Sequence, residues 1–95
     1  MFHFINWSRA ALALEKAAKC AASRDERMTA HYLVKAHRLV LKLRCNLSET
    51  RALISLYDRV LDAAQGIGGT MPIRQNCEEM KKMLEEIKQS EWPSA

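Results

Sequence analysis

Apolar residues recur at intervals of three and four along four separate stretches of this 95-residue chain. Such spacing places them on one side of an α-helix, whereas a half-buried strand needs them at every second position. The chain is rich in residues that favour helices, and only three Gly and two Pro interrupt it. Residues that favour strands are too few and too scattered to form a sheet. The sequence therefore predicts an all-α fold.

The breaks between the four stretches are short. The expected helices run from about Phe2 to Ala22, Asp25 to Arg44, Ser48 to Gln65, and Met71 to Glu91. Short connections of this kind join antiparallel neighbours in a bundle. We therefore predict a single domain over residues 1–95, folded as an antiparallel up-down bundle of four helices.

Short polar residues and glycines mark the expected ends of these helices. Ser23, with a Glu three residues later, has the pattern of a capping box that would begin the second helix. Ser48 is the expected N-cap of the third helix, and Gly66 is its expected left-handed C-cap. The fourth helix is expected to begin at Thr70, and a start at Asn76 stays open.

Each expected helix carries one apolar stripe that would face the core. The stripes are Trp7, Ala11, Leu14, Ala18 and Ala21; Met28, Tyr32, Ala36, Leu39 and Leu43, widened by Leu33 and Val40; Leu53, Tyr57, Val60 and Ala64, widened by Ile54 and Leu61; and Ile73, Cys77, Met80, Leu84 and Ile87. The small residues of the first stripe would let another helix approach closely. Tyr57 is expected in the interior of the bundle.

The charge and the cysteines are typical of a protein of the reducing cytoplasm. Fifteen Lys and Arg against eleven Asp and Glu give a net charge of +4, without the concentrated patch that nucleic-acid binding usually needs. Cys20, Cys45 and Cys77 are odd in number and far apart, so neither a disulfide framework nor a zinc site is expected. The apolar start of the chain is soon followed by Arg9 and Glu15, and we expect neither a signal peptide nor a membrane span.

Residue types that carry chemistry are present, but their spacing does not form a catalytic or metal site. His31 and His37 lie on separated sides of the second helix, whereas two metal ligands on a helix are usually four residues apart. Both histidines are expected to be exposed and to bind no metal. The segment from Gly66 to Gly69 lacks the Lys of a phosphate-binding loop. We therefore expect a protein that is not an enzyme and holds no cofactor.

Two helices carry apolar residues outside their core stripes. Val34 and Leu41 lie one heptad apart on the second helix, on a side that helical geometry turns away from the core. Ile5 and Leu12 repeat this spacing on the first helix. Such stripes either line a partner groove or are buried by an irregular bundle, and the sequence leaves both open. The predicted partner-binding residues are Ile5, Leu12, Val34 and Leu41, with Ile54 and Leu61 as weaker candidates.

Short motifs follow one another along the chain in a particular order. Trp7 to Ala11 aligns with Tyr-Asp-Gly-Ala-Leu, with Arg in place of the Gly, and Val34 to Leu43 aligns with an Asn-Lys-Ala-Gln-x-Ile run. After a turn at residues 46–48, Leu56 to Leu61 matches Leu-Tyr-Asp-Tyr-(Met/Ile)-Leu. The last helix, from Met80 to Trp92, ends in Trp. In this order the chain resembles the flagellar secretion chaperone FliS family, as a divergent member with a shortened N-terminus.

This resemblance implies a cytoplasmic chaperone that binds the disordered C-terminal segment of flagellin, prevents premature polymerisation and delivers the cargo for export. A disordered segment can fold in the apolar grooves of a small helical scaffold as it binds. Two alternatives stay open: a chaperone of a virulence type III secretion subunit, and a small helical regulator that binds nucleic acid through Lys35, Arg38 and Lys42. The expected partner is flagellin or a related secreted subunit, and the chain is expected to be a monomer or a homodimer.

Overall fold

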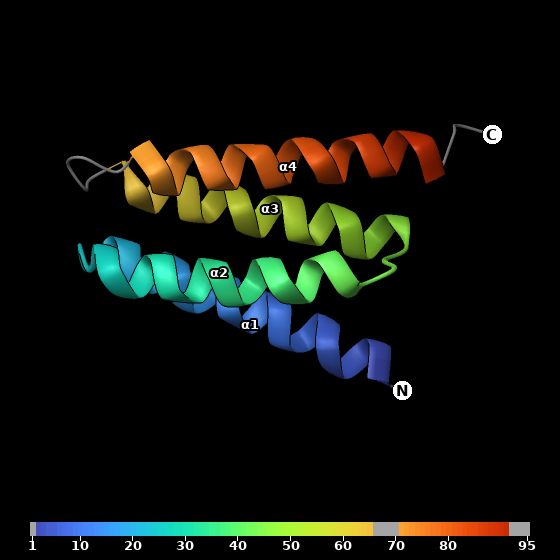
Figure 1. Ribbon diagram of the computed structural model, residues 1–95, viewed down its shortest axis with the longest axis horizontal. Helices are drawn as coiled ribbons and strands as arrows, with labels where there is room; N and C mark the ends of the chain where they lie inside the picture. The colour runs from blue at the N-terminus through green and yellow to red at the C-terminus, as the bar shows by residue number, and fades with distance from the viewer. Residues whose placement is uncertain (1, 66–70, 92–95) are drawn as a thin grey trace.

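The computed structural model describes residues 2–65 and 71–91, with side chains at 5–65 and 73–86. Four helices make up this part of the chain: α1 (Phe2–Ala22), α2 (Glu26–Lys42), α3 (Leu47–Ala64) and α4 (Met71–Glu91). Consecutive helices run in opposite directions along the long axis of the molecule (Figure 1). The predicted all-α, up-down bundle of four helices is confirmed. No helix of the described residues is long and apolar enough to cross a membrane.

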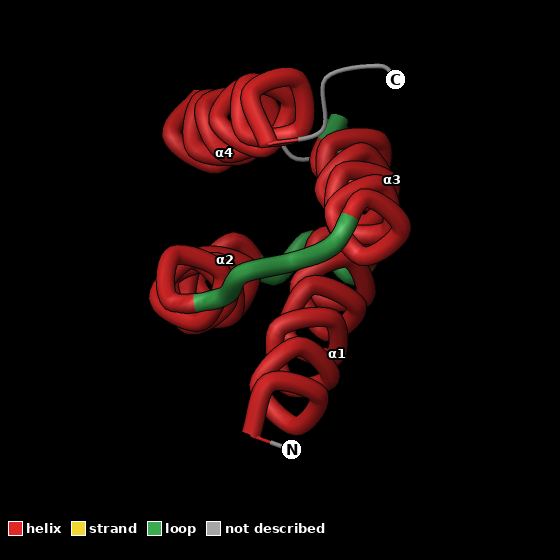
Figure 2. Tube along the Cα trace, turned by 90° about the vertical axis from the view of Figure 1, so that its right-hand side faces the viewer, coloured by secondary structure: helices red, strands yellow, loops and turns green. Residues whose placement is uncertain are grey.

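The four helices form two antiparallel hairpins, α1–α2 and α3–α4, which are joined where α1 packs against α3. Figure 2 shows the connection from α2 to α3 crossing the molecule diagonally, so that these consecutive helices are not neighbours. α2 packs along its length only with α1 and meets α4 at few positions. As a result, the outer side of α2 is left uncovered by the rest of the bundle.

A tight turn joins α1 to α2. The main-chain nitrogen of Asp25 donates to the carbonyl of Cys20 (2.9 Å), and that of Arg24 donates to the carbonyl of Ala21 (3.0 Å). Arg24 has the left-handed φ of 62°, which this helix ending requires of its C′ residue. The Asp25 side chain then caps α2 by accepting from the nitrogen of Met28 (3.1 Å). The prediction of Ser23 as the N-cap of α2 was wrong, because Ser23 lies in the turn that ends α1 and Asp25 caps α2 instead.

Asn46 begins α3 through a reciprocal pair of hydrogen bonds. Its side chain accepts from the nitrogen of Glu49 (2.8 Å), and the Glu49 carboxylate accepts from the nitrogen of Asn46 (3.1 Å). The prediction of Ser48 as the N-cap was wrong, because only Asn46 has a Glu three residues later to complete the capping box. The caps predicted at Gly66 and Thr70 lie outside the described residues, and α4 begins before the alternative start at Asn76.

The core consists of small and aliphatic side chains around the buried ring of Tyr57. The predicted stripes of α3 and α4 are confirmed, except at Ile87, whose side chain lies outside those described. On α1 the buried residues are instead Ala10, Ala13, Leu14, Ala17 and Ala21. The prediction was wrong for Trp7, Ala11 and Ala18, which are half-buried. The buried side of α1 is turned because this helix packs against α2 as well as α3.

The buried side of α2 also differs from the predicted one, with the buried residues one position later along the helix instead of one position earlier as on α1. Thr29, Leu33, Ala36 and Val40 are buried. The prediction was wrong for Met28, Tyr32, Leu39 and Leu43, which are only half-buried. Tyr32, Leu39 and Leu43 still pack against the core, but α2 lacks the second close neighbour that would cover them.

Candidate functional site

Four large aliphatic side chains are exposed among the described residues, and all four lie on α1 and α2. Ile5 is 51%, Leu12 50%, Val34 47% and Leu41 63% exposed. These are the residues whose spacing placed them outside the core stripes. The structure therefore puts them at the surface, and the alternative in which an irregular bundle buries them is wrong. An apolar stripe on each of two paired helices is typical of a surface that contacts another protein.

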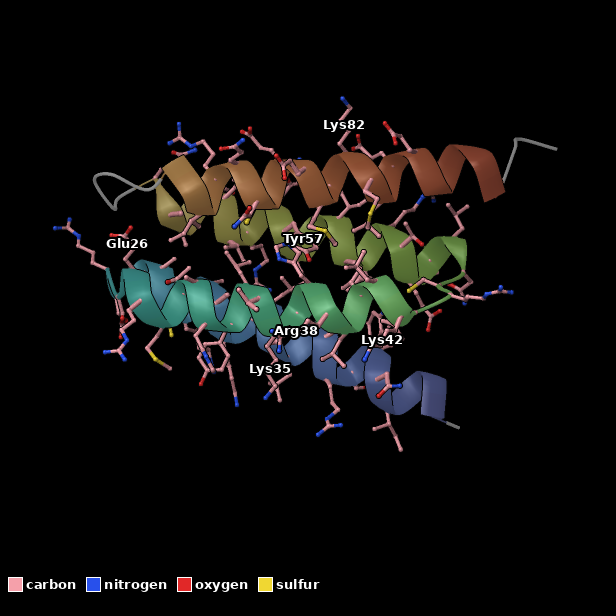
Figure 3. All side chains as sticks on the ribbon, viewed as in Figure 1. Glu26, Lys35, Arg38, Lys42, Tyr57 and Lys82 are labelled. Carbon is pink, nitrogen blue, oxygen red and sulfur yellow. The ribbon has the colours of Figure 1, made fainter. Side chains whose placement is uncertain are left out.

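Val34 lies in a hollow on the outer side of the α1–α2 hairpin, with a volume of about 760 Å³. The residues that line it are Arg9, Arg27, Ala30, His31, Val34, Lys35, Arg38 and Leu39. Every charged side chain in this lining is basic, and the floor is aliphatic. Figure 3 shows Lys35 and Arg38 together along the edge of α2 that borders α1. The hollow therefore offers both apolar contact and positive charge.

A smaller hollow, of about 90 Å³, continues this surface along α1. It is lined by Arg9, Leu12, Ala13, Lys16, Tyr32 and Lys35. Because Arg9 and Lys35 line both hollows, the two are adjacent. The ammonium group of Lys16 lies 5.6 Å from the centre of the Tyr32 ring, a cation–π distance. We refer to the linings of these two hollows together as the basic groove.

The charge of the chain is unevenly divided between the two hairpins. Residues 1–45, which contain α1 and α2, hold nine Lys and Arg and three Asp and Glu, a net charge of +6. Residues 46–95 hold six Lys and Arg and eight Asp and Glu, a net charge of −2. The modest overall charge of +4 conceals this division. Of the basic residues that the sequence grouped on the second helix, Lys35 and Arg38 line the larger hollow and Lys42 does not, and the fold adds Arg9 of α1 beside them.

Leu41 opens onto a different, apolar hollow of about 260 Å³. This hollow lies between the end of α2 and α4, and its lining comprises Val40, Leu41, Leu43, Cys45, Thr50, Met83 and Leu84. Burial, with a smaller contribution from the Glu49 carboxylate, raises the pKa of the Cys45 thiol to about 11. The thiol is therefore protonated and weakly nucleophilic at neutral pH. Val34 and Leu41 share one side of α2 but belong to separate hollows.

The two weaker candidates lie elsewhere on the molecule. Ile54 and Leu61 are half-buried on α3, where both pack against the core. Leu61 also lines a hollow of about 340 Å³ between α3 and α4, whose other residues include Asp58, Asp62 and Glu78. The structure does not bring Ile54 or Leu61 together with the exposed stripes of α1 and α2.

His37 is not exposed as predicted. Its ring stacks on that of Tyr57, with 5.8 Å between the centroids and 20° between the planes. Burial lowers the pKa of His37, and the main chain of Asn76 and the carboxylate of Glu79 oppose this shift less strongly. The sequence placed His37 at an exposed position of the second helix, on a different side from His31. It did not show that α3 and α4 approach α2 on that flank.

The described residues contain no group of three or more His, Cys, Asp or Glu placed to hold a metal ion. Burial raises the pKa of the Cys77 thiol to about 12, and Cys20, Cys45 and Cys77 form no disulfide. Comparison of the chain with known protein families, curated proteins and solved structures finds no match. The surface chemistry of the α1–α2 hairpin is therefore the main structural guide to function.

Proposed function

We propose that the protein binds a segment of another protein on its α1–α2 hairpin, and that it acts in the cytoplasm as a chaperone for the export of that partner. The observation that carries this proposal is the position of the exposed aliphatic side chains. Among the described residues, all four of the large ones lie on α1 and α2. Because each is about half exposed, a partner that covers the remaining area would gain roughly 1–1.5 kcal/mol per side chain. A binding role of this kind needs no catalytic group.

The proposed cargo is the disordered C-terminal segment of flagellin, held back from polymerisation until it is exported. The order of the motifs that resemble the FliS family supports this choice. A disordered segment that folds on binding loses conformational entropy, so its affinity stays moderate and its release remains easy. A chaperone of a virulence type III secretion subunit would use the same hairpin, and the two functions differ in the cargo.

Calorimetric titration of a flagellin C-terminal peptide tests this proposal. Val34→Asp and Leu41→Asp are expected to abolish binding, because each places a charge in an apolar contact. Both side chains are exposed, so helicity and melting temperature should stay close to those of the unaltered protein. Ser55→Asp, at an exposed position of α3, is the matched control and should bind normally. Unaltered binding by folded Val34→Asp and Leu41→Asp variants would exclude this surface.

A failure of the unaltered protein to bind the peptide would exclude flagellin as the cargo. Capture of partners from the host lysate, followed by mass identification, would then test the wider export role. A virulence secretion subunit among the captured proteins, lost with Val34→Asp, would support the second chaperone function.

The basic groove also supports a second class of function, nucleic-acid binding. Arg9, Lys35 and Arg38 could follow a phosphate backbone. However, the floor of the groove is aliphatic, and of the two rings in its lining Tyr32 is half-buried beneath Lys16, which leaves the imidazole of His31 as the exposed one. Bases would therefore find a single small ring to stack on, without the series of aromatic side chains that single-stranded nucleic acids follow. A gel shift of duplex DNA at low salt, removed by Arg38→Glu, would favour this function over the chaperone.

A further inference from the structure

We propose that the occupant of the basic groove is an acidic amphipathic helix, which lays an aliphatic stripe on Val34 and Leu12 and directs Asp and Glu side chains to Arg9, Lys35 and Arg38. This inference rests on the proposed function and adds the chemistry of the bound segment. It depends on three features of the α1–α2 hairpin: the spacing of its outer residues, the sign of its charges, and the contrast with the rest of the surface.

The outer residues of α2 combine basic and aliphatic types, with the aliphatic ones seven positions apart. Arg27, His31, Val34, Arg38 and Leu41 follow one another at intervals of four, three, four and three. Ile5, Arg9, Leu12, Lys16 and Lys19 follow the same intervals on α1. Residues at such intervals form a nearly straight stripe along a helix. A third helix laid along the hairpin would therefore meet aliphatic residues at heptad spacing with positive charges between and beyond them.

The length of this surface sets the length of the occupant. From Arg27 to Leu41 the outer stripe of α2 covers fifteen residues, a rise of about 21 Å at 1.5 Å per residue, and all of its members except Leu41 line the basic groove. Aliphatic residues seven positions apart lie about 10 Å from one another on any helix, so a partner with the same heptad spacing stays in register. A segment of about four turns is enough to cover the stripe.

The charges of the groove determine that the bound segment should be negatively charged. Its lining holds Arg9, Lys16, Arg27, Lys35 and Arg38, and it holds no acidic residue. All five side chains are exposed, so they are free to approach opposite charges on a partner. Each exposed pair contributes little alone, but several pairs of one sign distinguish an acidic helix from a basic one.

A second copy of this chain does not suit the groove. Its α1–α2 hairpin would bring like charges together. Its α3–α4 hairpin is acidic, but none of the described side chains there is an exposed large aliphatic residue. Within the side chains that the structure describes, neither hairpin therefore supplies acidic groups together with exposed large aliphatic groups. A nucleic acid would supply the negative charge and leave the aliphatic floor without an apolar partner.

The experiment uses the full chain and three labelled peptides of about 18 residues, long enough for the four turns required. The first carries Leu at heptad spacing flanked by Glu, the second has the same Leu flanked by Lys, and the third keeps Glu and replaces Leu with Ser. Binding is measured by fluorescence anisotropy in about 50 mM and about 500 mM NaCl. We expect the Leu-Glu peptide to bind about tenfold or more tightly than either other peptide, and less tightly at high salt.

Charge reversal identifies the residues responsible. The Lys35→Glu/Arg38→Glu variant is expected to bind the Leu-Glu peptide about tenfold more weakly and to bind the Leu-Lys peptide better than the unaltered protein does. The Arg51→Glu/Arg59→Glu variant is the matched control, because it makes the same change of net charge at exposed positions of α3. It should retain the original preference.

Equal affinity for the Leu-Glu and Leu-Lys peptides would overturn the inference, as would equal weakening by the two double variants. Equal binding of the Leu-Glu and Ser-Glu peptides would show attraction by charge alone and would also overturn it. Tighter binding of a DNA duplex of about 20 base pairs, lost only with Lys35→Glu/Arg38→Glu, would assign the groove to nucleic acid. If the unaltered protein forms a homodimer that dissociates only in the Lys35→Glu/Arg38→Glu variant, the groove would be assigned to a second copy of the chain.

The outcomes also separate this inference from the proposed function. A cargo lost with Val34→Asp but unaffected by Lys35→Glu/Arg38→Glu would overturn the acidic helix and leave the chaperone standing. If the unaltered protein binds the Leu-Glu peptide tightly but captures no exported subunit, the acidic helix would stand and the chaperone function would be overturned.

Discussion

Replacement of Tyr57 tests the packing of the bundle most directly, because Tyr57 is the largest of its fully buried side chains. Its ring stacks on His37 of α2 and lies close enough to Cys77 of α4 for that thiol to affect its ionisation. Tyr57→Ala would leave a cavity where three helices meet. Truncation of a buried aromatic residue costs about 3–5 kcal/mol. Small domains have a free energy of unfolding of only about 5–15 kcal/mol, so this variant should unfold at much lower denaturant concentration.

Tyr57→Phe separates the ring from the hydroxyl. The hydroxyl is buried, and within the described part of the chain it neither donates nor accepts a hydrogen bond. A buried polar group without a partner costs about 1–3 kcal/mol. Removal of the hydroxyl should therefore leave the free energy of unfolding equal to, or slightly above, that of the unaltered protein.

Urea unfolding followed by circular dichroism measures both effects. Leu56→Ala, at a half-buried neighbour on the same helix, is the control and should cost less than Tyr57→Ala. A loss well under about 1 kcal/mol for Tyr57→Ala would show that the ring does not lie in the core. A loss above about 1 kcal/mol for Tyr57→Phe would show that the hydroxyl has a partner in solution, and that the packing around it differs from the structure described.

Three further predictions concern the turns and the pH dependence of stability. Arg24→Gly should raise the free energy of unfolding by about 0.5–1 kcal/mol, because Gly adopts the φ of 62° without strain, whereas Arg24→Ala should change it little; equal melting temperatures for the two variants would contradict this. Asn46→Ala should lower the free energy of unfolding by about 1 kcal/mol through loss of the capping box, and an unchanged urea midpoint would show that the cap does not form in solution. The folded state lowers the pKa of His37 below its ordinary value of 6.5, so the unfolded state takes up the proton first. The free energy of unfolding should therefore fall as the pH drops below 6.5, and His37→Gln should reduce the slope of this fall against pH. Equal slopes for His37→Gln and the unaltered protein, from urea titrations across this range, would refute this prediction.

The helices, most of the core of α3 and α4, and the place of four aliphatic residues outside the core stripes followed from local spacing alone. Only the packing of the helices decided that these four side chains are exposed. A helix turns by about 100° per residue, so the intervals between apolar residues decide which side of each helix faces inward. This reasoning placed Tyr57 in the core and put Val34 and Leu41 outside it, as the structure has them. It needed no knowledge of which helices are neighbours.

The basic groove could not be predicted in this way, because it depends on which helices pair. Arg9 and Lys35 are 26 positions apart in the sequence, and only the packing of α1 against α2 brings them to one hollow. The same packing turns the buried side of α1, and the approach of α3 and α4 to one flank of α2 encloses His37. Spacing along a helix defines its apolar side, but the neighbours of that helix decide how much of the side is covered and which charges meet beside it.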